Sequence, residues 1–221
     1  MEYVQDFKCW YNAVCSNYAE NCTNDCIRYR EMYHLLQQSN LPQNKWYPVY
    51  LDAGIDIDKY ERLADIKDDI ETYVKNGNNL YICSLITGNG KTSWAIKLLL
   101  KYFDSIWAGN GFKTRGVYIH VPTFLLQLKN FSNPLSEQFK QKLLTCDIVI
   151  WDEIAYSNDI SNYDYNNILA YLESRLMSGK SNIYTSNCNT REQLEKQLGA
   201  KLSSRIWATS EIIEFKGKDR R

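Results

Sequence analysis

The chain has 221 residues, of which 44% are hydrophobic and 24% charged, which fits a globular protein with one α/β domain and a small additional module. Its 26 basic and 26 acidic residues cancel, so it is not a generally basic nucleic-acid-binding protein. Any nucleic-acid contact must come from a local patch or from several subunits together. The sequence has no apolar run of about 18 residues and no basic, apolar leader. We therefore expect a cytoplasmic protein without a membrane span.

Residues 1–45 are predicted to form a Cys-rich N-terminal module that binds a partner, with a helix from about Cys22 to Gln38. Two prolines and a glycine follow without an apolar period, so residues 46–58 are predicted as a linker. Several aromatic side chains are candidates for contacting the partner, although core packing would use the same residue types: Trp10, Tyr11, Tyr18, Tyr29 and Tyr33.

Four cysteines of this module, Cys9, Cys15, Cys22 and Cys26, are candidate ligands of a tetrahedral Zn²⁺ site. A helix would place Cys22 and Cys26 on one face, and His34 is a substitute ligand. A structural metal would also explain how so short a segment holds a fold. The spacing contains no Cys-x₂-Cys pair, so free buried thiols and disulfides are the alternatives.

From residue 59 to residue 221, helical and strand patterns alternate. Apolar residues between Tyr60 and Tyr73 recur at helical spacing. Short apolar strands are expected at residues 80–83, 116–121, 147–151, 181–185 and 211–215. Helices are expected between them at residues 92–103, 122–130, 135–144, 163–177 and 191–198. This alternation predicts an α/β domain with a parallel five-stranded sheet covered on both faces.

A phosphate-binding loop is predicted between the first of these strands and the next helix. The segment Leu85–Thr92 ends in the Gly-Lys-Thr of a Walker A loop, whose backbone N–H groups and helix N-terminus cradle phosphates. We expect Lys91 to reach the β- and γ-phosphates and the Thr92 hydroxyl to ligate Mg²⁺. The residues expected around the nucleotide are Thr87, Gly88, Asn89, Gly90, Lys91, Thr92 and Ser93. Leu85 stands where the motif has its first glycine, so an ordinary glycine-rich turn is the alternative.

Polar residues follow two later strands, at the sheet edge where ligands bind. Asp152 and Glu153 follow one buried strand. Asp152 is expected to hold Mg²⁺, and Glu153 to orient the attacking water. Asn187 follows the next strand and is expected to contact the γ-phosphate or that water. Ordinary polar strand ends are the alternative, but the order of these motifs favours an ATPase.

Arg205 lies between apolar anchors near the C-terminus. Its planar, permanently charged group suits a phosphoryl-transfer transition state, and on an outward surface it could complete a neighbour's site as an arginine finger. Lys201 is a weaker candidate for this role. A structural salt bridge is the alternative for Arg205.

Contacts with single-stranded DNA would need basic and aromatic side chains along one groove. The segment from Trp107 to Tyr118, with Lys113 and Arg115, is one candidate. The helix after Pro122 is another, with Lys129 and Phe131. Solvated loops are the alternative interpretation of both.

Together these motifs resemble the AAA+ helicase loaders of bacteria and their phages, of the DnaC/DnaI type, over about residues 59–221. The resemblance rests on the segments 87–92, 149–153, 184–187 and 202–206. It implies that Lys91 and Thr92 are the Walker A residues, and Asp152 and Glu153 the Walker B acids. It also implies that Asn187 is the sensor-1 residue and Arg205 the arginine finger, and that a C-terminal helical lid is absent.

The resemblance implies a Mg²⁺-dependent ATPase of replication initiation. Such a loader binds a hexameric DnaB-type replicative helicase through its N-terminal domain, oligomerises on it and helps place it on single-stranded DNA. One alternative is a nucleotide-gated adaptor ATPase, such as the IstB-like transposition helpers. Another is a small-molecule P-loop kinase, for which the sequence shows no basic lid motif.

Overall fold

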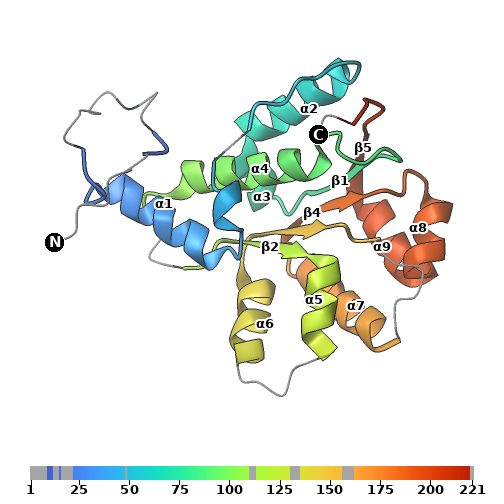
Figure 1. The fold of residues 1–221 in the computed structure, drawn as a ribbon. Coiled ribbons are helices and arrows are strands. Elements are labelled where there is room, and N and C mark those ends of the chain that lie inside the picture. Colours follow the sequence, from blue (N-terminus) through green and yellow to red (C-terminus); the bar gives the residue numbers. More distant parts are fainter. Residues whose placement is uncertain are drawn as a thin grey trace.

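The computed structural model describes residues 9–11, 15, 22–47, 49–109, 113–129, 135–155 and 162–219. Within them, five strands form one parallel sheet in the order β2-β3-β4-β1-β5. The strands are β1 (Asn79–Cys83), β2 (Gly116–His120), β3 (Ile148–Asp152), β4 (Ser181–Ser186) and β5 (Ser210–Glu214). Because all of them run in one direction, their carboxyl ends meet at one edge of the sheet (Figure 1), where ligands of such sheets bind.

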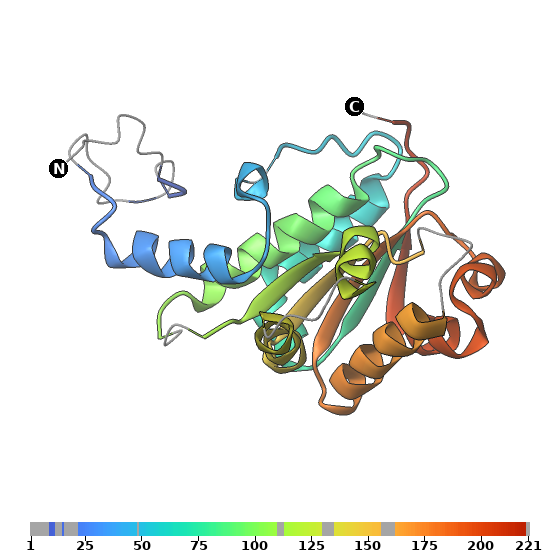
Figure 2. The same ribbon diagram turned by 60° about the horizontal axis from the view of Figure 1, so that its bottom comes forward.

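Helices cover both faces of the sheet, with α4 on one side and α7 on the other (Figure 2). The first face carries α1 (Ile27–Gln38), α2 (Ile57–Asp68), α3 (Ile70–Lys75) and α4 (Lys91–Ile106). The second carries α5 (Val121–Lys129), α6 (Leu135–Thr145), α7 (Asn162–Met177), α8 (Arg191–Leu198) and α9 (Ala200–Thr209). A 3₁₀ turn, η1 (Gln43–Lys45), follows α1. This architecture confirms the predicted α/β class and its parallel sheet. Among the described helices, none is long and apolar enough to cross a membrane.

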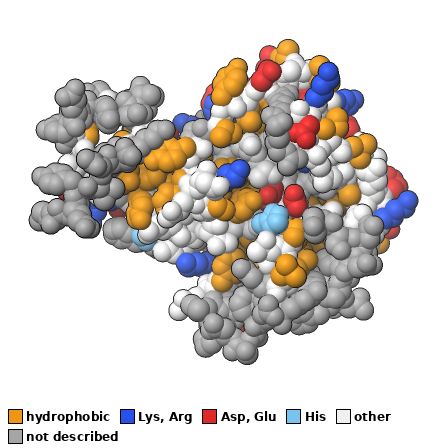
Figure 3. Space-filling model, viewed as in Figure 1, with side chains coloured by type: hydrophobic (Ala, Val, Ile, Leu, Met, Phe, Trp, Pro, Cys, Tyr) orange, Lys and Arg blue, Asp and Glu red, His pale blue; other side chains and the backbone are white. Residues whose placement is uncertain are grey.

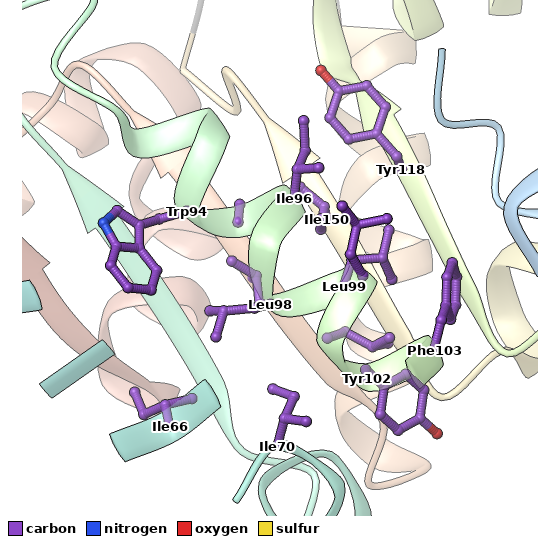
Figure 4. Close-up of a cluster of buried hydrophobic side chains, with 14 of the residues drawn as sticks. Ile66, Ile70, Trp94, Ile96, Leu98, Leu99, Tyr102, Phe103, Tyr118 and Ile150 are labelled. Atoms are coloured by element: carbon purple, nitrogen blue, oxygen red, sulfur yellow. The ribbon is translucent and has the colours of Figure 1, made fainter. Parts of the chain in front are cut away.

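Strands β1 and β3 are mostly apolar because both of their faces are buried, whereas β4 and β5 also carry several polar residues. In β1, Leu80 and Ile82 belong to the core on the α4 side, whereas Tyr81 and Cys83 belong to the core on the α9 side. All four side chains are fully buried, and Leu80 and Ile82 each contribute about 1.5–3 kcal/mol by leaving water. Figure 4 shows the first core, where side chains of α4 such as Leu99 pack over the sheet.

Two helical regions differ from the prediction. The helix expected between Tyr60 and Tyr73 is divided into α2 and α3 at Asp69, whose backbone (φ −113°, ψ 32°) leaves the helical region. Helix α9 was not expected from the sequence. It begins directly after Gly199, whose φ of 73° ends α8 and turns the chain.

The N-terminal segment packs on the same core as the sheet. In α1, Arg28 donates a hydrogen bond to Asp104 of α4 over 2.8 Å. Three side chains of α1 are buried in the cluster that holds the α4 side chains: Met32, Leu35 and Leu36. The predicted linker also contains the first turn of α2, which begins at Ile57. The domain boundaries at residues 45 and 58 stay predictions.

The N-terminal aromatic side chains pack largely against one another. Trp10 stacks on Tyr29, with ring centroids 4.5 Å apart, and Tyr29 stacks on Tyr33 at 6.2 Å. We call the group the aromatic cluster, and it consists of Trp10, Tyr29, Tyr33, Trp46 and Tyr47. Tyr11 is buried, and Tyr18 lies outside the described residues. The cluster leaves Tyr33 37% exposed at its surface.

Candidate nucleotide-binding site

A cavity of about 790 Å³ opens at the carboxyl ends of the strands. This volume lies in the range of cofactor and ligand sites. Residues of the loop after β1, of the ends of β3 and β4, and of the segment before α2 line it: Thr87–Ser93, Glu153, Thr185–Asn187, Lys45 and Val49–Asp52. The predicted loop residues and the predicted strand-end residues Glu153 and Asn187 therefore meet around one space.

The loop after β1 is held in shape by side chains and by two glycines in left-handed conformations. Ser84 accepts a hydrogen bond from Asn89 Nδ2 over 2.6 Å and another from the backbone N–H of Ile86 over 3.1 Å. Gly88 and Gly90 have φ angles of 70° and 101°. The left-handed backbone favours glycine at Gly90, where a Cβ would also come within 3.2 Å of the Tyr60 hydroxyl, a tight contact.

Lys91 and Leu85 occupy different sides of this loop. The Lys91 ammonium donates to the carbonyl of Ile86 over 2.9 Å and lies 3.4 Å from Asn89 Oδ1, so it is folded over the loop that would receive phosphates. Leu85 is 61% exposed and is not among the residues that line the cavity. The side chain that replaces the motif's first glycine therefore leaves the cavity open.

Asp152 is the most heavily hydrogen-bonded carboxylate of the site. Its Oδ1 accepts from the hydroxyls of Thr92 over 2.7 Å and Thr185 over 2.6 Å, and its Oδ2 accepts from the Tyr118 hydroxyl over 2.6 Å. Burial, followed by the charge of Asp152, raises the pKa of Tyr118, which keeps this phenol a neutral donor. The hard oxygen donors of Thr92 and Asp152 lie together, and this donor set fits Mg²⁺.

Glu153 has a strained backbone that is held from the neighbouring strand. Its φ of 56° is uncommon for a residue with a side chain. Its N–H donates to Thr185 Oγ1 over 3.0 Å, and the N–H of Ile154 donates to the Thr185 carbonyl over 3.0 Å. These bonds stabilise the turn that places the Glu153 side chain, which is 43% exposed, at the cavity.

His120 is a partner of Glu153 that was not predicted from the sequence. Its Nε2 lies 3.4 Å from Glu153 Oε2, and its Nδ1 is 2.8 Å from Thr123 Oγ1. Figure 3 shows acidic and histidine side chains side by side near the centre of this face. His120 is the last residue of β2, the neighbour of β3, and Tyr118 lies in the middle of the same strand. The polar end of this strand is a signal that could have found His120, whereas Tyr118, inside an apolar strand, gives no comparable signal.

Arg205 lies away from the cavity within its own chain. On α9, its Nε is 3.5 Å from Glu173 Oε1, which Lys201 Nζ also approaches to 3.2 Å. The Arg205 side chain is 54% exposed and is not among those that line the nucleotide cavity. If Arg205 takes part in hydrolysis, it would have to do so at the nucleotide site of a neighbouring subunit.

Of the residues predicted to contact DNA, Lys113 is exposed to solvent, whereas Arg115 is engaged in an ion pair within the chain. Arg115 forms an ion pair with Asp147, which directly precedes β3 at the side of the sheet opposite to the nucleotide cavity. Burial alone would raise the pKa of Asp147, but hydrogen bonds from Arg115, Lys180 and Tyr102 outweigh it and hold the pKa below its usual value. Lys113 is exposed and lines a second cavity of about 490 Å³ beside Arg115. Phe131 and the side chain of Lys129 lie outside the described residues.

The predicted zinc site is not supported. No group of three or more His, Cys, Asp or Glu side chains within the described parts of the chain is arranged to hold a metal ion. Helix α1 begins at Ile27, so Cys22 and Cys26 do not share a helix face. The reason is local: Thr23 Oγ1 accepts from the backbone N–H of Asp25 over 3.3 Å, which favours a turn over a helix there.

We compared the sequence and the fold of the chain with those of known proteins. No protein-family model and no curated protein matches the sequence. Among solved structures, the DnaC helicase loader has a TM-score of 0.65 at 16% identity, covering 79% of this chain and 100% of that chain. The fold of this chain is therefore similar to that of the DnaC helicase loader and of DnaI. DnaI has a TM-score of 0.62 at 18% identity, covering 84% of this chain and 100% of that chain. DnaA from Aquifex aeolicus, bound to AMPPCP, has a TM-score of 0.55 at 15% identity, covering 79% of this chain and 50% of its own.

Proposed function

We propose that the chain is a Mg²⁺-dependent ATPase that acts as a helicase loader in replication initiation. The observation that supports this proposal is that the loop residues, Glu153 and Asn187 line one cavity of nucleotide size, and that Asp152 accepts a hydrogen bond from Thr92 of that loop. The likeness to DnaC and DnaI supports the replication role, and the AMPPCP-bound DnaA supports an ATP-type ligand.

The roles of the phosphate-side residues follow from their positions. Backbone N–H groups of the loop and the start of α4 would bind the phosphates, with Lys91 as the cation. Thr92 and Asp152 would hold Mg²⁺, which when bound neutralises charge on the phosphates. Glu153 would accept a proton from the attacking water and orient it, and Asn187 would donate a hydrogen bond to the γ-phosphate or to that water.

The base-side residues come from the segment before α2. Val49, Tyr50 and Leu51 offer apolar and aromatic surface to a base, and Tyr50 is 92% exposed. Asp52 and Lys45 are the charged groups of the same wall. Val49–Asp52 of this wall were predicted as part of a linker, and we assign them a part in nucleotide binding.

The partner-binding part of the proposal rests on the N-terminal segment and on Arg205. The aromatic cluster, with Tyr33 partly exposed, is the surface we assign to the hexameric replicative helicase. Subunits assembled on the helicase would bring Arg205 to the next subunit's nucleotide, and single-stranded DNA would be the substrate of loading. Zinc is not part of this proposal.

The test is complex formation between the purified chain, with ATP and Mg²⁺, and the hexameric replicative helicase of the same replicon. Co-elution in gel filtration, weakened by Tyr33→Ala, is the expected result. ATP binding without any helicase complex would contradict the loader role. Co-elution with a transposase instead would support the IstB-like adaptor.

A further inference from the structure

Tyr118 connects two parts of the chain that are far apart in sequence. It lies in β2, its ring is 9% exposed, and Figure 4 shows its hydroxyl directed away from the labelled apolar side chains. That hydroxyl donates to Asp152 Oδ2 over 2.6 Å. The side chain of Tyr118 is therefore a direct support of the carboxylate that pairs with Thr92.

The backbone of the same residue is held by the N-terminal segment. The N–H of Tyr118 donates to the Ser39 carbonyl over 2.7 Å, and Asn40 Nδ2 donates to the Tyr118 carbonyl over 3.3 Å. Among the described strands, β2 lies at one edge of the sheet and pairs only with β3, so these bonds cover its outer edge. The end of α1 thus attaches to the sheet at the residue that supports Asp152.

The arrangement of donors around Asp152 gives Tyr118 a distinct task. Thr92 and Thr185 both donate to Oδ1, whereas Tyr118 is the donor to Oδ2. Hydrogen bonds to both oxygens fix the plane of the carboxylate, and outer partners that orient a metal ligand typically change metal affinity about 10–100-fold when removed. Without the phenol, Oδ2 loses this orientation.

We propose that Tyr118 is a positioning residue of the Mg²⁺ site. We also propose that Tyr118 links the N-terminal segment, which its backbone contacts, to Asp152, which its hydroxyl contacts. The inference rests on the proposed ATPase function. It adds Tyr118 to the site and a structural connection from the end of α1 to Asp152. A partner that pulls on the end of α1 would change the metal site through Tyr118.

The experiment measures the affinity of a fluorescent ATP analogue, first with EDTA and then across a Mg²⁺ titration, together with the thermal unfolding midpoint. Tyr118→Phe removes only the hydroxyl. The matched control is Tyr102→Phe, because the buried Tyr102 hydroxyl donates to Asp147 Oδ2 over 2.9 Å at the other end of β3. Both variants should lower the unfolding midpoint by similar amounts.

Tyr118→Phe is expected to raise the Mg²⁺ concentration for half-maximal tightening about tenfold while leaving the affinity in EDTA unchanged, and Tyr102→Phe should change neither. An equal shift in both variants, or none in Tyr118→Phe, would overturn the positioning role. If the affinity of the wild-type protein for the ATP analogue did not depend on Mg²⁺, the proposed function itself would be overturned.

Asn40→Asp tests the attachment, because aspartate accepts the same backbone conformation (φ 60°) but cannot donate to the Tyr118 carbonyl. A Mg²⁺ shift in the same direction as that of Tyr118→Phe, but smaller, is expected. A wild-type Mg²⁺ response in Asn40→Asp would overturn the route through the N-terminal segment.

Discussion

Thr185 offers a perturbation whose size can be worked out from the structure. Its hydroxyl, in a side chain that is 1% exposed, donates to Asp152 Oδ1 and accepts from the N–H of Glu153. Thr185→Val keeps nearly the same shape and removes both bonds. Thr185→Ser keeps both bonds and removes one methyl group, so it serves as the control.

The expected cost of Thr185→Val is about 3 kcal/mol. Leaving the N–H of Glu153 without an acceptor costs roughly 1–3 kcal/mol, and a hydrogen bond to a charged group is worth roughly 1.5–3 kcal/mol. Because Asp152 keeps its bonds from Thr92 and Tyr118, we take about 1.5 kcal/mol for each loss. Thr185→Ser should cost only about 0.8 kcal/mol, the value of one buried methylene-sized group.

Thermal unfolding measures this difference, since about 3 kcal/mol corresponds to roughly 6–12 °C for a chain of this size. Thr185→Val should also slow ATP turnover, because the turn that positions Glu153 loses its anchor, while Thr185→Ser should turn over ATP normally. The reasoning is refuted if Thr185→Val unfolds within about 1 °C of wild type or if Thr185→Ser is equally unstable.

Further predictions concern the phosphate loop, the water-orienting acid, the finger and the pH dependence of stability. Lys91→Ala should abolish nucleotide binding in a fluorescence titration, and unchanged affinity would remove the loop from the site. Glu153→Gln should bind ATP but hydrolyse it at least about 100-fold more slowly, whereas normal turnover would exclude Glu153 from its role. Mixed Arg205→Ala and Lys91→Ala subunits should recover activity if the finger acts in trans, and a mixture as inactive as its components would count against this. Because the folded-state pKa of Asp147 is lowered, its contribution to stability is complete above its ordinary pKa of about 3.9 and is lost as the pH falls through the lowered value. Asp147→Asn should therefore lower the urea midpoint near neutral pH and approach wild type in strong acid.

The parts of the site that are contiguous in sequence could be predicted. The Gly-Lys-Thr loop, the Asp152–Glu153 pair and Asn187 each follow an apolar strand, and parallel strands bring such ends to one edge. The apolar runs of β1 and β3 likewise predict that the sheet is buried on both sides, because both faces of these two strands carry large apolar side chains.

The parts that depend on strand order and on distant packing could not be predicted. Tyr118 and His120 reach Asp152 and Glu153 only because β2 pairs with β3, and the sequence does not specify that neighbour. The cavity wall around Tyr50 was interpreted as a linker because the segment contains two prolines and a glycine and has no apolar period. α9 was missed because half of its residues are polar, although Leu202 and Ile206 are one turn apart and fully buried.

The most direct test of the account is ATP turnover by the purified protein in Mg²⁺, with and without single-stranded DNA and the hexameric replicative helicase. The account predicts Mg²⁺-dependent hydrolysis that single-stranded DNA stimulates, together with a stable helicase complex. Turnover that is indifferent to DNA, with no helicase complex, would contradict the loader function, and the absence of any Mg²⁺-dependent turnover would contradict the assignment of an ATPase.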